Sequence, residues 1–380
     1  MALTKSEVLA RLEAVASPQG EPLPRTGALS DIVVSDGKVF FSITVDAGVV
    51  NAWEPVRKRA EAAVKALPGV TSVMVALTAE RSARGPAPGA RPQPGTTSPA
   101  AAAAAQRAHG TVGVPGVGAI IAVASGKGGV GKSTTAANLA LALSDLGLRT
   151  GVLDADIYGP SIPKLLGIKG RPQTRGGTRL IPMDGYGLKV MSIGFLVEEE
   201  TPMIWRGPMV MSALTQMLRE VDWNELDVMV VDMPPGTGDA QLTMAQQVPL
   251  AGAIIVSTPQ DLALIDARKG LNMFRKVDVP VLGIVENMST FICPHCGSAT
   301  DIFAHGGAKS EANRLGVAFL GEVPLTLAIR ETSDAGRPVV VSAPSSSAAE
   351  AYRNIAAKAW DELERDQRSA RASPRIVMET

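Results

Sequence analysis

Cysteine is nearly absent from this 380-residue sequence and occurs only as Cys293 and Cys296. Two neighbouring cysteines do not make a disulfide framework, and they are typical of a reducing compartment in which thiols stay available for chemistry. The chain also lacks an excess of charge of either sign, because 37 Lys and Arg residues balance 37 Asp and Glu residues. This balance excludes the overall basic character that nucleic acid or an anionic membrane selects, so we expect neither as a partner.

Long hydrophobic runs are missing as well. No apolar stretch approaches the roughly 18–20 residues that a bilayer-spanning helix needs. Residues 1–12 alternate charged and apolar side chains, which differs from the continuous apolar segment of a secretory signal. We therefore expect a cytoplasmic protein, long enough for two domains.

Residues 1–81 predict a small α+β domain. Thr4-Lys5-Ser6-Glu7 has the capping-box pattern and precedes apolar residues at helical spacing. A two-stranded hairpin, a second helix over about residues 53–67 and a third strand follow, which gives the order α-β-β-α-β. Residues 82–117 are rich in Ala, Pro, Gly and Ser and contain few large apolar side chains, so we expect a flexible linker there.

From residue 118 onward, apolar strand-like runs alternate with helical patterns. The predicted strands cover residues 119–124, 150–153, 188–193, 227–231, 253–257, 279–285 and 317–323. Buried runs separated by helices are typical of a mostly parallel sheet with helices on both faces. We expect a doubly wound α/β domain over residues 118–365, closed by a helix over about residues 346–364, and a disordered tail over residues 366–380.

A glycine-rich segment between the first of these strands and the following helix matches the pattern G-x-x-x-x-G-K-[ST]. Its residues, with the one that follows, are Gly126, Lys127, Gly128, Gly129, Val130, Gly131, Lys132, Ser133 and Thr134. Glycines let backbone amides wrap the phosphates, while Lys132 supplies positive charge and Ser133 a hydroxyl ligand for magnesium. The motif predicts a P-loop NTPase domain that binds ATP with Mg²⁺.

Carboxylates and an amide follow other predicted strands of this domain. Asp154 and Asp156 lie where an open α/β sheet presents its loops to a ligand, although a turn-capping role is an alternative, above all for Asp154. Asp232 ends an apolar strand in the manner of a Walker B carboxylate, whose charge helps to hold hydrated magnesium. Asn287 ends a later strand and is by itself an ordinary strand-end residue.

Cys293-Pro294-His295-Cys296 comes just after that strand, in a segment that we expect to be short and irregular. Two thiolates can bind a soft metal, but four ligands are needed for structural zinc and for the common iron-sulfur clusters. Two subunits around a two-fold axis would supply four cysteines. A zinc bridge between subunits and a redox-active thiol pair remain alternatives, and His295 and His305 are further possible ligands, although such histidines more often belong to polar loops.

Together these motifs resemble the Mrp/ApbC-type iron-sulfur cluster carriers, which are relatives of the nitrogenase iron protein and of MinD. The matching segments are residues 126–134, 154–161, 232–239, 258–261, 286–288 and 293–296. The early Lys127 resembles the signature lysine of deviant Walker A ATPases, which implies that it reaches the nucleotide of a partner subunit. The resemblance further implies that Asp156 polarises the attacking water and that Asn287 reads the adenine edge.

The same resemblance implies an ATP-hydrolysing homodimer that holds a [4Fe-4S] cluster between subunits through Cys293 and Cys296. Such a carrier exchanges clusters with an assembly scaffold and with apo client proteins. The first domain resembles the small iron-sulfur-assembly domain through residues 63–70, but residues 44–50 lack the cysteine that many relatives carry, so docking is its expected role. The alternatives are a MinD- or ParA-like positioning ATPase, which would commonly need a basic surface or tail, and a zinc-bridged ATPase scaffold.

Overall fold

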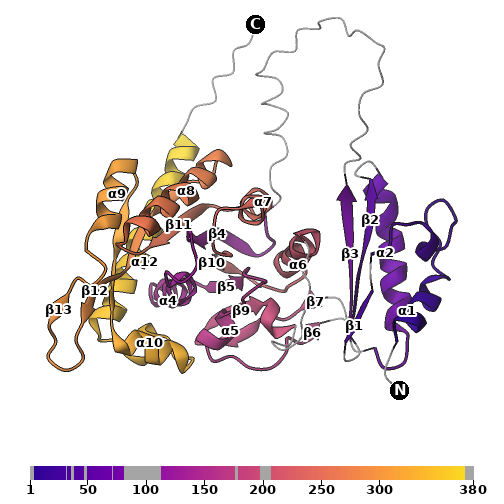
Figure 1. Cartoon of the computed structure of the whole chain (residues 1–380), viewed down its shortest axis with the longest axis horizontal. Coiled ribbons are helices and arrows are strands. Elements are labelled where there is room, and N and C mark those ends of the chain that lie inside the picture. Colours follow the sequence, from indigo (N-terminus) through magenta and orange to yellow (C-terminus); the bar gives the residue numbers. More distant parts are fainter. Residues whose placement is uncertain are drawn as a thin grey trace, which may run out of the picture. The chain divides into compact units, whose positions relative to one another are not determined.

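The computed structural model describes residues 4–30, 32–35, 38–46, 49–70, 72–80, 113–175, 179–196 and 207–372 (Figure 1). The chain divides into two compact units, residues 1–110 with 200–214 and residues 111–199 with 215–380. None of the helices in these described ranges is long and apolar enough to cross a bilayer.

The small unit has the predicted α-β-β-α-β order. Its elements are α1 (Lys5–Leu12), β1 (Val33–Ser35), β2 (Lys38–Asp46), α2 (Val50–Lys65) and β3 (Ser72–Glu80), with a 3-10 turn at Leu23–Arg25. Helix α1 begins at the predicted capping box, in which the Glu7 carboxylate accepts the Thr4 N–H at 2.8 Å and the Thr4 hydroxyl accepts the Glu7 N–H at 3.4 Å. Among the described residues, β2 pairs antiparallel with β1 and parallel with β3.

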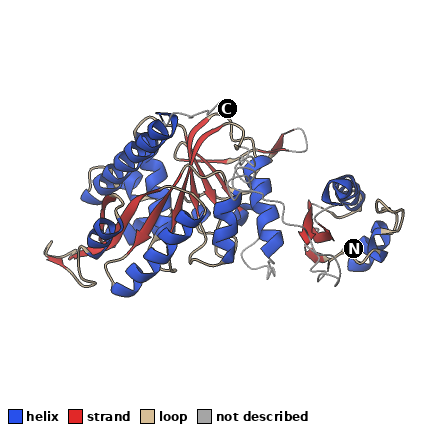
Figure 2. Ribbon diagram, turned by 90° about the horizontal axis from the view of Figure 1, so that it is seen from above, coloured by secondary structure: helices blue, strands red, loops and turns tan. Residues whose placement is uncertain are grey.

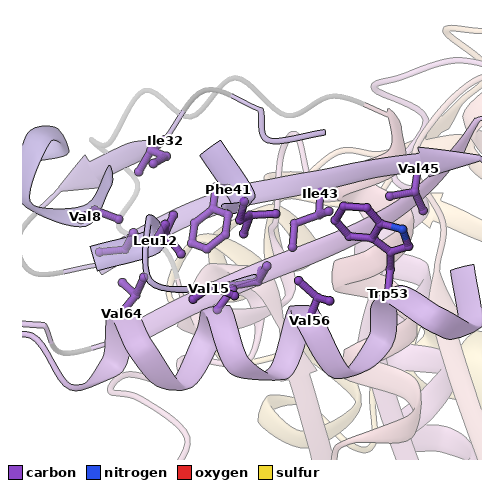
Figure 3. Packing of buried hydrophobic residues seen from close by; sticks show 14 residues of the cluster. Val8, Leu12, Val15, Ile32, Phe41, Ile43, Val45, Trp53, Val56 and Val64 are labelled. Atoms are coloured by element: carbon purple, nitrogen blue, oxygen red, sulfur yellow. The ribbon is translucent and has the colours of Figure 1, made fainter. Parts of the chain in front are cut away.

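Alternate residues of β2 build the core of the small unit. Phe41 and Ile43 point toward one face of the sheet and are almost completely buried, where they pack with Val56 and Val64 of α2 (Figure 3). The period of two in a strand and the one-turn spacing in a helix bring these apolar side chains together. The small unit therefore has a hydrophobic core of its own. Burying each such side chain contributes about 1.5–3 kcal/mol to the free energy of unfolding.

The large unit contains, within the described residues, a nine-stranded sheet in the order β13-β12-β11-β4-β10-β5-β9-β8, with β14 beside β12. Its seven predicted strands are β4 (Val117–Ala124), β5 (Thr150–Asp154), β9 (Leu188–Ser192), β10 (Leu226–Asp232), β11 (Gly252–Ser257), β12 (Val281–Ile292) and β14 (Phe319–Leu325). All seven pair in parallel, whereas β8 (Met183–Gly185) and β13 (Ala299–Thr300) pair antiparallel. A small separate ribbon joins β6 (Thr174–Arg175) and β7 (Arg179–Leu180).

Helices cover both faces of this sheet (Figure 2). The helices of the large unit are α4 (Lys132–Asp145), α5 (Ile162–Leu165), α7 (Asp239–Gln247), α8 (Asp261–Lys276), α9 (Gly307–Leu315), α10 (Leu327–Asp334), α11 (Val339–Ser342) and α12 (Ser347–Ala372). The residues of α6 (Gly207–Arg219) are divided between the two units. Helix α4 packs on β5 and β10 and against α12, whereas α8 packs on β11 and β12. The doubly wound prediction is confirmed.

The strand order creates a switch point beside β4. From β4 the chain crosses over β10 to β5 on one side, and from β10 it crosses back to β11 and β12 on the other. In open α/β sheets, ligands bind in the crevice outside the carboxyl ends of the strands at such a point. The loops after β4, β5 and β10 therefore form the expected ligand site.

The structure differs from the predicted start of this domain. Strand β4 begins at Val117, and Val114 before it is only 5% exposed. These residues therefore belong to the folded domain rather than to the predicted linker over residues 82–117. Residues 82–112 lie outside the described part of the chain.

The predicted disordered tail over residues 366–380 is also partly wrong, because α12 continues to Ala372. Ion pairs one helical turn apart, from Arg365 to Glu362 and from Arg368 to Glu364, stabilise this extension. Residues 373–380 lie outside the described part of the chain.

Candidate functional site

The glycine-rich segment forms a phosphate loop between β4 and α4. Helix α4 begins at Lys132, and its N-cap Gly131 has a φ of 81°, a left-handed conformation that side chains rarely adopt. A Cβ atom on Gly131 would come within 2.1 Å of the Asn287 amide nitrogen, and one on Gly126 within 2.2 Å of the backbone of Asp266. Packing and backbone conformation therefore both require glycine in this loop.

Lys132 and Asp232, which are 100 residues apart in sequence, form a buried ion pair. The Lys132 Nζ atom lies 2.5 Å from Asp232 Oδ1 and 3.1 Å from the Ser133 hydroxyl. Asp232 is fully buried, and among the described residues its Oδ2 atom has no hydrogen-bond partner. A buried carboxylate oxygen without a partner, next to a serine hydroxyl, fits a magnesium ion or its bound water.

Burial and neighbouring negative charge raise the pKa of the carboxylates around Lys132. Asp154 and Asp232 are register partners on β5 and β10. Burial, followed by the charge of Asp232, raises the pKa of Asp154 to about 7. Burial likewise raises the pKa of Asp232, while Lys132 opposes that shift. Excess negative charge of this kind is a suitable counterpart for a cation.

Asp154 has the capping role that was one of the two sequence interpretations. Its Oδ2 atom accepts the N–H groups of Ser161 at 3.0 Å and Ile162 at 3.1 Å, together with the Ser192 hydroxyl at 2.9 Å. Its Oδ1 atom accepts the Asp156 N–H at 3.2 Å. The carboxylate thus holds the loop after β5, and the contact from Ser192 is one that sequence reasoning missed.

Asp156 lies in that loop with a partly exposed side chain. Its carboxylate accepts the Gly159 N–H at 3.3 Å. Burial raises its pKa, and the charges of Lys132 and Asp232 act on it in opposite directions. Asp156 therefore belongs to the same electrostatic cluster as the phosphate loop, and its role toward water stays a prediction.

The loop after β10, which lies in the matching segment 232–239, is tied to the phosphate loop through Ser125. The Gly236 N–H donates to the Ser125 carbonyl at 2.9 Å, and the Ser125 hydroxyl donates to the Lys127 carbonyl at 2.9 Å. Gln241 of α7 donates to the Pro235 carbonyl at 2.5 Å. Within the described residues the Lys127 ammonium forms no ion pair, and its reach toward a second subunit stays a prediction.

Asn287 has a position that the sequence did not predict. Its amide nitrogen donates to the Val130 carbonyl at 2.8 Å, and its side chain is buried. The residue therefore supports the phosphate loop from β12, across 157 positions of sequence. Recognition of adenine by the same amide stays a prediction.

The two cysteines lie just past β12 in a short segment outside the strands, as expected, and this segment is the turn of a hairpin. Strand β12 continues seven residues beyond its predicted end at residue 285, to Ile292, and pairs with β13. The Cys293 N–H donates to the Ser298 carbonyl at 3.0 Å, and the Gly297 N–H donates to the Cys293 carbonyl at 2.9 Å, which closes the turn.

Both thiols are free, with Cys293 half-buried and Cys296 exposed. The Cys296 thiol donates to the Ser298 hydroxyl at 3.1 Å. Hydrogen bonding with the side chain and the backbone of Ser298 lowers the pKa of the Cys296 thiol. A lowered pKa favours the thiolate, which is the form that ligates metals. The hairpin begins six residues after Asn287 on the same strand, so β12 links the nucleotide site to the cysteines.

Comparisons with known proteins agree with both parts of this arrangement. Residues 116–360 match the family described as the NUBPL iron-transfer P-loop NTPase, and residues 5–75 match the iron-sulfur cluster assembly protein family. The iron-sulfur cluster transfer protein NUBPL of Dictyostelium discoideum is 53% identical over 272 residues, which cover 70% of this chain and 84% of that protein. The iron-sulfur cluster carrier protein of Escherichia coli (strain K12) is 54% identical over 252 residues, which cover 66% and 68%.

A solved structure supports the fold of the large unit. The nucleotide-binding protein of Archaeoglobus fulgidus, in complex with ADP and with cobalt, is 42% identical to this chain. It aligns with a TM-score of 0.53 and covers 59% of this chain and 88% of its own. The resemblance inferred from the motifs is confirmed: this chain belongs to the NUBPL iron-transfer P-loop NTPase family, with an iron-sulfur-assembly domain at its N-terminal end.

Proposed function

We propose that this protein is an ATP-dependent carrier that holds a [4Fe-4S] cluster between two copies of the chain and transfers it to apoproteins. The observation that carries the proposal is that both cysteines of the sequence lie on one hairpin tip of the domain that contains the phosphate loop. One chain supplies two thiolates and a [4Fe-4S] cluster takes four, so two identical hairpins would complete the site.

The chemistry of the hairpin suits a cluster that is carried as cargo. The pKa of Cys296 is lowered by Ser298, which favours the soft thiolate ligand that iron-sulfur clusters require. Cys296 is also exposed, so a second subunit and a client protein can both approach it. An assembly scaffold that supplies clusters and apo clients that accept them are the partners this role needs.

The residues around the phosphate loop fit ATP with Mg²⁺. Lys132 would exchange Asp232 for the phosphates, and Ser133 with Asp232 would hold the metal ion, which neutralises charge on the phosphates when bound. Asp156 would orient water, and Lys127 of one copy would reach the nucleotide of the other. This arrangement makes hydrolysis depend on the dimer, and we expect it to be slow and coupled to cluster transfer.

The small unit would serve client or scaffold docking rather than metal binding. It has its own hydrophobic core, and its sequence between residues 44 and 50 contains no cysteine. Its match to an iron-sulfur cluster assembly family supports a role in the same process.

Anaerobic reconstitution with iron and sulfide tests the proposal on the full chain. We expect broad visible absorption and about four irons per dimer on size-exclusion chromatography. Cys293→Ser and Cys296→Ser should each lose the cluster and the cluster-dependent dimer, while nucleotide binding is retained. His295→Ala, on the same turn, is the matched control and should keep the cluster.

Other results would contradict the proposal. Retention of about four irons per dimer by either cysteine variant would show that other ligands complete the site. A dimer that holds zinc and refuses iron would indicate the zinc-bridged scaffold instead. ATP-dependent binding to liposomes or duplex DNA without cluster binding would indicate a positioning ATPase.

A further inference from the structure

A second group of metal-binding side chains lies beside the base of the cysteine hairpin. Glu286 of β12, His305 of the loop before α9 and Glu322 of β14 each offer a ligand atom, and these atoms lie within 4.8 Å of one another. His305 Nε2 is 3.6 Å from Glu322 Oε2, and His305 Nδ1 is 3.1 Å from the Thr290 hydroxyl. Neither the nucleotide site nor the cysteine pair uses this group.

The charges of this group are unbalanced. Glu286 and Glu322 are register partners on neighbouring strands, and like charges at such positions destabilise a sheet. A third carboxylate, from Asp301, lies 4.0 Å from His305 Nδ1. Three carboxylates around one imidazole leave a net negative charge even when the imidazole is protonated, so a divalent cation balances the group better than His305 alone.

Glu286 is fully buried and its orientation is fixed. Its Oε1 atom accepts the Gly306 N–H at 2.9 Å, and its Oε2 atom accepts the Ala308 N–H at 2.6 Å. Each carboxylate oxygen has a further lone pair, so these bonds hold the group without using all of its acceptor capacity. His305 and Glu322 are 42% and 48% exposed, which leaves the group open to an ion from solvent.

We propose that Glu286, His305 and Glu322 form a site for a divalent transition-metal ion such as Zn²⁺, Co²⁺ or Fe²⁺, separate from the cysteine pair. An imidazole with carboxylates suits ions of this class. Bonds of about 2.0–2.2 Å hold ligand atoms at most about 4.4 Å apart, so the three side chains need only small adjustments. A bound ion would join β12, β14 and the loop before α9, and so stiffen the base of the hairpin that carries the cysteines.

The test uses the full chain with Cys293→Ser and Cys296→Ser, so that thiolates do not compete for the metal. After chelator treatment, it is titrated with Co²⁺ and with Zn²⁺ in nucleotide-free and magnesium-free buffer, by absorption spectroscopy and calorimetry. We expect saturation at one ion per chain and a cobalt spectrum without thiolate charge transfer. Hydrogen exchange in residues 290–305 should slow when the ion binds.

Adding His305→Ala or Glu322→Gln should weaken metal binding by at least about tenfold. Mutating even a residue that only hydrogen-bonds to a metal ligand lowers metal affinity by about 10–100-fold. Adding His295→Ala, an exposed histidine on the same hairpin, is the control and should leave binding unchanged. Circular dichroism confirms that each variant is folded. Absence of stoichiometric binding in the cysteine-free chain, or unchanged affinity in folded His305→Ala, would overturn the proposal.

Discussion

Replacing Asn287 with alanine distinguishes two roles of its side-chain amide, which are support of the phosphate loop and recognition of adenine. The side chain donates to the Val130 carbonyl at 2.8 Å, so the variant loses a support of the phosphate loop. A lost hydrogen bond costs about 0.5–1.5 kcal/mol, and a buried carbonyl left without a partner costs about 1–3 kcal/mol. Because 1.4 kcal/mol corresponds to about tenfold in affinity, costs of this size predict that nucleotide binds about 2- to 100-fold more weakly.

The assay is calorimetric titration of the full chain with ATP and, separately, with GTP. A role in supporting the loop acts through the phosphates, so both affinities should fall by the same factor and their ratio should not change. Asn287→Asp, which keeps an acceptor but loses the N–H donor, should be at least as weak as alanine. Asn313→Ala, at an exposed position of α9, is the control. A loss confined to ATP would refute the loop-support reasoning and assign the amide to adenine.

Four further predictions concern the same domain. Lys132→Ala should weaken ATP binding by at least about tenfold, since hydrogen bonds to charged groups contribute about 1.5–3 kcal/mol, whereas Lys127→Ala should slow hydrolysis with binding retained. Both are measured by titration and phosphate release, and unchanged hydrolysis in Lys127→Ala would contradict its role in a partner's site. Asp156→Ala should bind ATP and fail to turn it over; normal turnover would exclude it as the water-orienting carboxylate. The raised pKa of Asp154, about 7, means that the folded state keeps this proton to higher pH than the unfolded chain. The nucleotide-free protein should therefore lose unfolding free energy as the pH rises from about 5 to about 8. Urea midpoints should fall over that range and flatten in Asp154→Asn, and a wild-type midpoint that rises would show the shift has the opposite sign. Deletion of residues 1–112 should leave a cooperatively unfolding ATPase, because the nucleotide motifs all lie beyond them; loss of the thermal transition would show structural dependence on the small unit.

Local patterns in the sequence determined the elements and the phosphate loop. Apolar runs such as residues 119–124 have to be buried on both faces, and the glycines of residues 126–131 are the residues that tolerate the loop's backbone and close packing. The capping box at Thr4 and Glu7 likewise acts over one helical turn. Each of these features depends on residues that are close together in the sequence, so it could be predicted without knowledge of the fold.

Long-range contacts were decided only by the tertiary structure. The sheet order brings Asp232 to Lys132, and β12 brings Asn287 to the phosphate loop, because parallel strands align residues that the chain separates by whole crossovers. The carboxyl end of a strand marks a residue as a candidate but does not say which partner it meets. Register is likewise invisible in the sequence, and it is register that places Glu286 opposite Glu322 beside the cysteine hairpin.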